Sequence, residues 1–209
     1  MQANNHVRVF RPLRGGIAIS SPRIDRLGTL GCVVTANGGA ERWILTCYHV
    51  LARRDTADLQ DGEPVHQVSS TNPPEVVART RRDRADAALD VAAARVVDGI
   101  ETVREVLGIG PVTAAKAPEV GMRVVKSGVA TGVSEGVVSR IEGTRVQIEM
   151  PPGFPSKYEL SDISDSGSLW VEISSRAGVA LHFGGNDVGV EKAFAVSLPH
   201  VLQVLRLDL

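Results

Sequence analysis

Residues 161–170 read SDISDSGSLW, a polar turn that leads into an apolar segment. At the centre of this turn Ser166 lies between Asp165 and Gly167, and a glycine tolerates both a positive φ and the close approach of another molecule. A serine hydroxyl is a poor nucleophile at its free pKa, so it needs a base, a group that orients the base, and donors for an oxyanion. Asp, Ser and Gly are also the commonest turn residues. Ser166 is therefore a candidate nucleophile only if such partners occur elsewhere in the chain.

The composition indicates a globular protein of one large domain or two small, closely joined ones. The chain has 209 residues, of which 43% are hydrophobic and 22% are charged, as in typical globular domains. The net charge is −1 and the two signs are interspersed, so neither nucleic acid nor a membrane surface is expected as a partner. The basic run at residues 79–84 is predicted to be a solvated loop.

The N-terminal sequence, the hydropathy and the cysteine content favour a cytoplasmic location for the protein. The N-terminal residues lack a basic region followed by an apolar run, and no stretch approaches the length that spans a bilayer. Cys32 and Cys47 are the only cysteines, too few for a disulfide framework, so we expect two free thiols in a reducing compartment.

Many short apolar segments separated by Gly and Pro turns predict an all-β protein. Two series of such strands flank residues 99–110, which indicates two β-barrels. The expected division is an N-terminal arm at 1–14, a first barrel at 15–98, a linker at 99–110 with one or two helical turns at 100–107, a second barrel at 111–197, and a C-terminal helix at 198–209. In the first barrel, Asn-Gly-Gly at 37–39 predicts a hairpin turn with positive φ. Ser197 and Pro199 are typical of a helix start.

A base for Ser166 should be fixed by the scaffold. The five histidines include His6 in a polar arm and His200 in the predicted helix, and both are therefore poor candidates. His49 directly follows the predicted buried strand 43–46, and Asp90 begins another strand. His49, Asp90 and Ser166 occur in the order base, orienting acid and nucleophile, with gaps of 90 − 49 = 41 and 166 − 90 = 76 residues.

Several motifs resemble one known family. TCYH at 46–49, DVAAARV at 90–96 and SDSG at 164–167 resemble the histidine, aspartate and serine motifs of chymotrypsin-like serine proteases. Further segments resemble bacterial trypsin-like peptidases of intracellular type, and the likeness extends from Arg11 to Leu207. These segments are RPLRGG at 11–16, KSGVATG at 126–132 and ALHFGG at 180–185.

The resemblance implies a chymotrypsin-like double β-barrel that acts as a serine endopeptidase through an acyl-enzyme, without metal or cofactor. It makes Ser166 the nucleophile, His49 the general base and acid, and Asp90 the buried carboxylate that fixes the His49 tautomer. Asp86, which is followed by Ala-Ala-Leu, is the rival to Asp90, but only Asp90 is followed at the right distance by Arg95-Val. The expected substrate is a protein or peptide that adds a strand to an exposed edge.

The resemblance also places the oxyanion hole at the backbone N–H groups of Ser164 and Ser166. The family has Gly where this chain has Ser164, and a serine with an unusual φ is strained. This departure keeps a second hypothesis open, a catalytically silent binding module with the protease fold, and it leaves room for a regulatory partner that reorders the hole. An esterase of the α/β-hydrolase class is disfavoured, because its triad runs Ser, Asp, His and its fold needs βαβ units.

The substrate pocket is expected from the resemblance between Leu160-Ser161 and the strand that contains His182, Phe183 and Gly184. Trypsin-type enzymes carry Asp at the position of Leu160, so cleavage after Lys or Arg is not expected. Two alternatives remain: a preference for small or apolar residues with His182 in the core, or a preference for Glu, because the LHFGG run resembles glutamyl endopeptidases.

Asp165 directly precedes the candidate nucleophile. An unpaired buried carboxylate is costly. We therefore predict that Asp165 is satisfied internally, by a basic side chain or by backbone and hydroxyl donors, without a new N-terminus made by cleavage.

Overall fold

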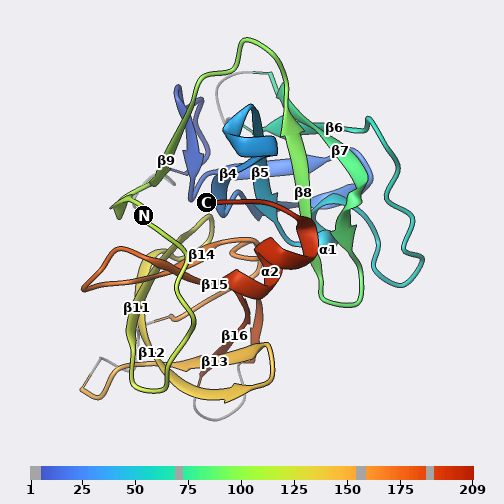
Figure 1. Cartoon of the computed structure of the whole chain (residues 1–209). Helices are drawn as coiled ribbons and strands as arrows, with labels where there is room; N and C mark the ends of the chain where they lie inside the picture. Colours follow the sequence, from blue (N-terminus) through green and yellow to red (C-terminus); the bar gives the residue numbers. More distant parts are fainter. Residues whose placement is uncertain (1–5, 69–72, 154–158, 187–190) are drawn as a thin grey trace.

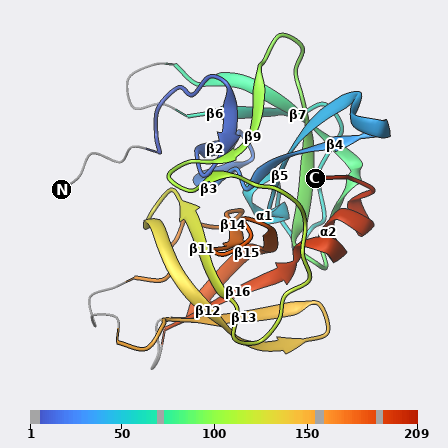
Figure 2. The same ribbon diagram turned by 60° about the vertical axis from the view of Figure 1, so that its left-hand side comes forward.

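The chain folds into two β-lobes with a short helix packed across them (Figure 1). The computed structural model describes residues 6–68, 73–153, 159–186 and 191–209. The first lobe is coloured from blue to green in Figure 1 and the second from yellow to red. The two lobes are also separate in the rotated view of Figure 2. The predicted all-β double barrel with a short C-terminal helix is confirmed.

The first lobe is a seven-stranded sheet with the order β3-β2-β6-β7-β8-β5-β4. Its interior strand β8, between β7 and β5, begins with four buried residues, of which three are alanines. Small side chains here let neighbouring elements approach closely, and helix α2 packs against this strand. The strands are β2 (Ala18–Ser21), β3 (Ile24–Thr29), β4 (Cys32–Ala36), β5 (Glu41–Thr46), β6 (Pro64–Gln67), β7 (Glu75–Asp86) and β8 (Val91–Val96).

Two short helical elements belong to the same lobe. The 3-10 turn η1 (Asn37–Gly39) joins β4 to β5, and φ is positive at all three residues, which confirms the predicted hairpin turn. Helix α1 (Tyr48–Leu51) directly follows β5. A buried strand therefore leads straight into the segment that carries His49.

The second lobe is a closed barrel with the strand order β11-β12-β13-β16-β15-β14. Apolar residues alternate with polar ones along β13, where Val146 and Ile148 are buried and their neighbours are not, as a strand with one face on the core requires. Trp170 is fully buried in the core of this barrel. The strands are β11 (Arg123–Gly128), β12 (Gly132–Glu142), β13 (Arg145–Glu149), β14 (Leu169–Glu172), β15 (Gly178–Asn186) and β16 (Lys192–Ser197).

Two local predictions were wrong because the strand partners lie far away in the sequence. Residues 100–107 were expected to contain helical turns, but they hold β9 (Thr102–Val106), which pairs in parallel with β1 (Leu13–Gly15) and antiparallel with β10 (Gly110–Pro111). The basic run at 79–84 was expected to be a loop, but it lies within β7, between β6 and β8. Its arginines are mostly exposed while Thr80 is buried, so a strand keeps the charges in water.

Helix α2 (Leu198–Leu205) packs its apolar side onto the large core that includes residues of both lobes. It ends at Arg206, whose φ of 53° is left-handed, and is therefore shorter than the predicted 198–209. The chain then returns to the first lobe, where Asp208 exchanges two backbone hydrogen bonds with Thr35, at 2.7 and 2.8 Å.

In the part of the chain that the structure describes, no helix combines the length and apolar character needed to cross a bilayer.

Gly31 provides a test of the packing between the lobes. A Cβ atom at this position would collide with the carbonyl oxygen of Gly167 in the second lobe. We predict that Gly31→Ala lowers the free energy of unfolding by about 1–3 kcal/mol, as for other overpacked sites, measured by urea denaturation.

The control is Val120→Ala, because this valine is 66% exposed and its loss should change the free energy of unfolding by less than about 0.5 kcal/mol. Equal stability of the two variants would contradict the tight contact at Gly31.

Candidate active site

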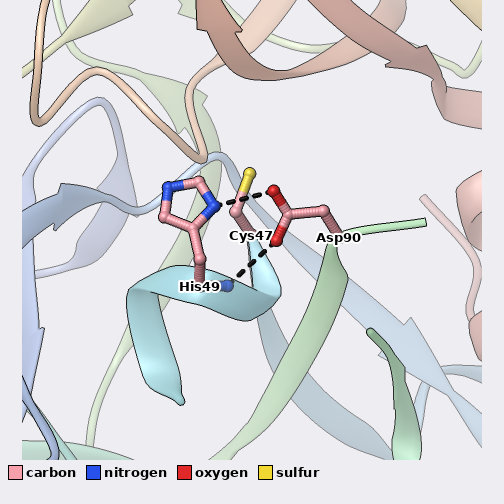
Figure 3. Close-up of side chains that lie close together, drawn as sticks. All are labelled: Cys47, His49 and Asp90. Carbon is pink, nitrogen blue, oxygen red and sulfur yellow. Dashed lines mark hydrogen bonds and ion pairs between the residues drawn. The ribbon is translucent and has the colours of Figure 1, made fainter. Parts of the chain in front are cut away.

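His49 and Asp90 form a doubly hydrogen-bonded pair (Figure 3). The backbone N–H of His49 donates to Oδ1 of Asp90 at 3.0 Å, and its ring Nδ1 lies 2.7 Å from Oδ2. The Asp90 side chain is only 3% exposed, whereas that of His49 is 36% exposed. Figure 3 shows the second ring nitrogen on the side away from Asp90. Asp90 therefore fixes the imidazole through Nδ1, and Nε2 of His49 is left to accept or donate a proton on the side away from Asp90.

Asp86, the rival carboxylate, lies in a different environment. Its Oδ1 accepts a hydrogen bond from the backbone N–H of Leu89 at 2.9 Å, so it closes the turn between β7 and β8. The same turn ends at Asp90, whose φ of 63° is unusual for a residue other than glycine. Asp90, and not Asp86, is the carboxylate that contacts His49 in this structure.

Arg54 holds this turn from the opposite side. Its guanidinium donates to the carbonyl oxygens of Ala87 and Ala88, at 3.0 and 3.2 Å. It also lies 3.5 Å from Oδ2 of Asp90. Sequence reasoning missed Arg54, because nothing in the Arg53-Arg54 pair after α1 indicates a contact with a turn more than 30 residues away.

Ser166 is carried by a turn that is hydrogen-bonded to the first lobe. The backbone N–H of Thr29 donates to the carbonyl oxygen of Ser166 at 2.8 Å, and the Thr29 hydroxyl donates to that of Ser164 at 2.7 Å. Gly167, with a φ of 94°, packs so closely on Thr29 and Thr46 that a Cβ atom would not fit. Thr29 was not foreseen, because its partners in the serine turn are 135 residues or more away.

Ser166 and His49 line the same cavity, of about 260 Å³. Its walls come from β3, α1, the turn 161–166 and the end of β15. Among the described residues, no hydrogen bond links Ser166 to His49, and the hydroxyl of Ser166 lies 3.5 Å from the carbonyl oxygen of Phe183. Such hydrogen bonds are often long in the absence of substrate.

Ser164 adopts a φ of 86°. This is the left-handed region that favours glycine and is uncommon for other residues. The hydrogen bond from Thr29 to its carbonyl oxygen holds the peptide in this conformation. The sequence analysis attached a conformational cost to an unusual φ at Ser164, and the structure has such a φ. The assignment of this residue to an oxyanion hole stays a prediction.

Asp165 is satisfied entirely by internal partners, as predicted. Nζ of Lys126 and the hydroxyl of Thr131 approach Oδ2 at 2.8 and 2.7 Å, and the backbone N–H groups of Ala130 and Thr131 donate to Oδ1 at 2.8 and 3.2 Å. Both charged side chains are fully buried. Burial alone would raise the pKa of Asp165, but the Lys126 charge and these hydrogen bonds hold it below its usual value. Burial lowers the pKa of Lys126 despite the attraction of Asp165.

The residues predicted for the substrate pocket lie in three different places. Ser161 and Gly184 line the 260 Å³ cavity, together with Gly185. Leu160 and His182 are 0% and 1% exposed and lie in the interior of the second lobe. Phe183 lines two smaller cavities. The predicted specificity stays a prediction.

His182 packs edge-on against Trp170, with ring centroids 6.1 Å apart, and its Nδ1 is buried without a hydrogen-bond partner among the residues that the structure describes. Burial, and then the charge of Lys126, lower its pKa to about 3. Near neutral pH His182 therefore carries no charge.

Glu191 is a further residue that sequence reasoning missed. Its Oε1 accepts hydrogen bonds from the backbone N–H groups of Leu160 and Ser161, at 2.8 and 3.0 Å. The expectation that Lys and Arg are excluded rested on an apolar pocket base at Leu160. Glu191, from another segment, brings a carboxylate to the backbone of Leu160 and Ser161. The assumption that the pocket beside Leu160 has no acidic group was therefore incomplete.

Cys47, His49 and Asp90 are the one group of potential metal ligands among the described residues, with ligand atoms within 4.8 Å of one another (Figure 3). The Cys47 thiol, however, donates to the carbonyl oxygen of His182 at 3.0 Å. Burial raises its pKa well above the usual range, and metals bind the thiolate. The arrangement suits a proton-carrying His–Asp pair better than a metal centre.

Two β-lobes, with a hydrogen-bonded His–Asp pair on the first and a serine turn on the second, are the arrangement of the chymotrypsin-like serine-protease fold. The sequence profile described as "Trypsin-like peptidase domain" matches residues 28–174. The chain therefore belongs to the trypsin-like peptidase domain family. No protein of curated function matches it by sequence.

Solved structures show the same fold at low sequence identity. The Nocardiopsis protease NAPase has a TM-score of 0.68 and 16% identity, and the match covers 93% of this chain and 97% of that one. A glutamic acid-specific serine protease that utilises a histidine triad in substrate binding has a TM-score of 0.69 and 18% identity, with coverages of 94% and 100%. Cellulomonas bogoriensis chymotrypsin has a TM-score of 0.65 and 17% identity, with coverages of 94% and 97%.

The buried Lys126–Asp165 pair leads to a stability prediction. Lys126→Met leaves a buried carboxylate without its cation, so we expect the free energy of unfolding to fall by about 3–5 kcal/mol, measured by urea denaturation at pH 7. The matched control is Lys116→Met, because Lys116 is 41% exposed and pairs with Glu172 at 3.0 Å. Its loss should cost less than about 1 kcal/mol. Similar losses in both variants would show that Asp165 does not depend on Lys126.

His182 leads to a prediction of pH dependence. Its folded pKa lies below the unfolded value, so the unfolded state takes up a proton first as the pH falls below about 6.5. The associated stability is complete above that pH and is lost towards pH 3. We predict that His182→Gln removes about 2 kcal/mol of the stability difference between pH 7 and pH 5.

The measurement is urea denaturation at both pH values, with His66→Gln as the matched control, because His66 keeps partial access to water. We expect the control to retain the wild-type pH dependence. An unchanged pH dependence in His182→Gln would show that this histidine is not held neutral.

Proposed function

We propose that this protein is a serine endopeptidase that hydrolyses peptide bonds in protein or peptide substrates through an acyl-enzyme. The observation that carries the proposal is that a doubly hydrogen-bonded His49–Asp90 pair and Ser166 share one cavity. In this proposal Ser166 is the nucleophile, His49 the general base and acid, and Asp90 the orienting carboxylate. Membership of a peptidase family supports the substrate class.

The reaction follows from this arrangement of groups. The oxygen of Ser166 attacks the carbonyl carbon of the scissile bond while its proton passes to His49, and Asp90 stabilises the imidazolium that forms. His49 then gives the proton to the leaving amine as the C–N bond breaks, which leaves an ester on Ser166. Water attacks this ester with the same help from His49, and the acid product and free Ser166 are released.

The backbone N–H groups of Ser164 and Ser166 are the proposed donors to the oxyanion. The left-handed φ at Ser164 supports this role, because the conformation usual for glycine is kept although a serine occupies the position. Thr29 then acts as a positioning residue, since its hydroxyl holds the carbonyl of Ser164. Loss of one oxyanion donor reduces turnover by about 100 to 1,000-fold.

Two further parts of the proposal concern processing and location. Because Lys126 neutralises Asp165 from within the fold, we infer that no new N-terminus made by cleavage is needed for activity. Cys32 and Cys47 are buried free thiols, which supports a reducing compartment, and we propose the cytoplasm.

A fluorophosphonate probe tests the proposed nucleophile. We expect it to label the unprocessed protein, and we expect labelling to disappear in Ser166→Ala and to fall sharply in His49→Ala. Asp90→Asn should keep the fold and lower peptide hydrolysis about ten-thousandfold, because His49 then favours the wrong tautomer.

Asp86→Asn is the matched control, and it should leave hydrolysis close to the wild-type rate. If Asp86→Asn loses hydrolysis while Asp90→Asn keeps the wild-type rate, Asp86 and not Asp90 is the orienting carboxylate. Folded protein that neither reacts with the probe nor cleaves peptides would make the chain a silent binding module.

A further inference from the structure

Phe183 connects Ser166 to a second part of the surface. Its carbonyl oxygen lies 3.5 Å from the hydroxyl of Ser166. Its ring stacks on that of Phe194, with centroids 6.4 Å apart and planes inclined by 24°. The backbone of Phe183 thus belongs to the candidate active site, while its side chain points into a separate, aromatic region.

Phe183 lines two cavities. One of about 130 Å³ also has walls from Phe194, Gln147 and Arg140, and one of about 80 Å³ reaches Leu89 and Asp90. Phe183 and Arg145 line both. The two cavities therefore share one aromatic ring and one arginine, and we refer to them together as the Phe183 groove.

Arg145 is the cation in this groove that lacks an acidic partner. Its guanidinium lies over the Phe183 ring, 5.8 Å from the centroid, and it makes no ion pair with any residue that the structure describes. The other two arginines differ, since Arg140 pairs with Glu142 at 2.5 Å and Arg54 lies 3.5 Å from Asp90. The net charge around the groove is therefore positive, and its source is Arg145.

We propose that the Phe183 groove binds an acidic side chain of the substrate. This side chain belongs to a residue close to the cleaved bond, but not to the substrate residue that occupies the 260 Å³ cavity beside Ser166. The inference rests on the proposed function, because it assigns the groove to the same peptide. The carboxylate pairs with the guanidinium edge of Arg145, and the methylene groups of the side chain lie on the aromatic floor.

The physical chemistry favours an acidic residue over an apolar one. A guanidinium that stacks on a ring keeps its N–H donors in the plane, where a carboxylate binds them in a fork. The aromatic floor keeps water away from one side and so strengthens the pairing. An extended peptide advances about 3.3 Å per residue, so the groove is within reach of a side chain about two to four residues from the cleaved bond.

The experiment compares matched peptides that differ only by Glu or Gln at each position flanking a cleaved bond, which is first located with a peptide library. For the wild-type protein at low ionic strength we expect about tenfold higher kcat/KM for Glu over Gln at one of these positions. In Arg145→Gln this ratio should fall to about one, with the Gln peptide cleaved as before. In Arg145→Lys, which keeps the charge and loses the fork, an intermediate ratio is expected.

Arg123→Gln is the matched control, because it removes an exposed charge that is paired with Glu135 and lines neither cavity of the groove. It should keep the preference for Glu. A wild-type ratio of one at every position overturns the proposal, and so does a preference for Glu that survives in Arg145→Gln.

A binding assay separates this inference from the proposed catalytic function. Fluorescence anisotropy with Ser166→Ala and the same labelled peptides measures affinity without cleavage. If the wild type proves inactive, tighter binding of the Glu peptide that is lost in the double variant with Arg145→Gln still supports the groove. Equal binding of the Glu and Gln peptides overturns the groove assignment, even where the fluorophosphonate probe labels Ser166.

Discussion

The buried ion pair of Lys126 and Asp165 is the constraint on which the geometry of the serine turn depends. Two full charges in a protein interior are tolerated only when they are paired and hydrogen-bonded. Here this requirement fixes the carboxylate against one cation, one hydroxyl and several backbone N–H groups. Asp165 stands between Ser164 and Ser166, so the backbone of both neighbours is fixed as well. Gly128 belongs to the same arrangement, because a Cβ atom there would collide with the carboxylate.

The candidate site is divided between the two lobes, and short backbone contacts hold its halves together. His49 and Asp90 come from the first lobe, and Ser166 comes from the second. Thr29 and Gly31 of the first lobe contact the serine turn directly. The position of His49 relative to Ser166 is thus determined by lobe packing, because no hydrogen bond joins these two side chains in the part of the chain that the structure describes.

Features that depend on a short stretch of sequence could be predicted, whereas features that depend on contacts between distant segments could not. His49, Asp90 and Ser166 are each marked by a short local pattern, and the structure brings the first two into contact and all three to one region. The internal partners of Asp165 followed from the cost of a buried charge, although the particular lysine, 39 residues away, did not. Strand β9, Glu191 and Arg54 were missed because their partners come from distant segments. The unexposed position of His182 depends on the packing of Trp170, which no local pattern reports.

The long separation between the segments that meet at this site has a consequence for the order of folding. The hydroxyl of Thr29 bonds to a residue 135 positions later, and Thr35 pairs with Asp208 across 173 positions. Contacts between residues so far apart in the sequence form late in folding, because the entropy cost of closing the long loop comes before the contact can stabilise the fold. During synthesis the first lobe emerges with His49 and Asp90, while the serine turn and the terminal residues that bind back to β4 are still to be added. A nascent chain therefore lacks the assembled serine turn until the segment that contains Ser166 has been added to a first lobe that already holds Thr29.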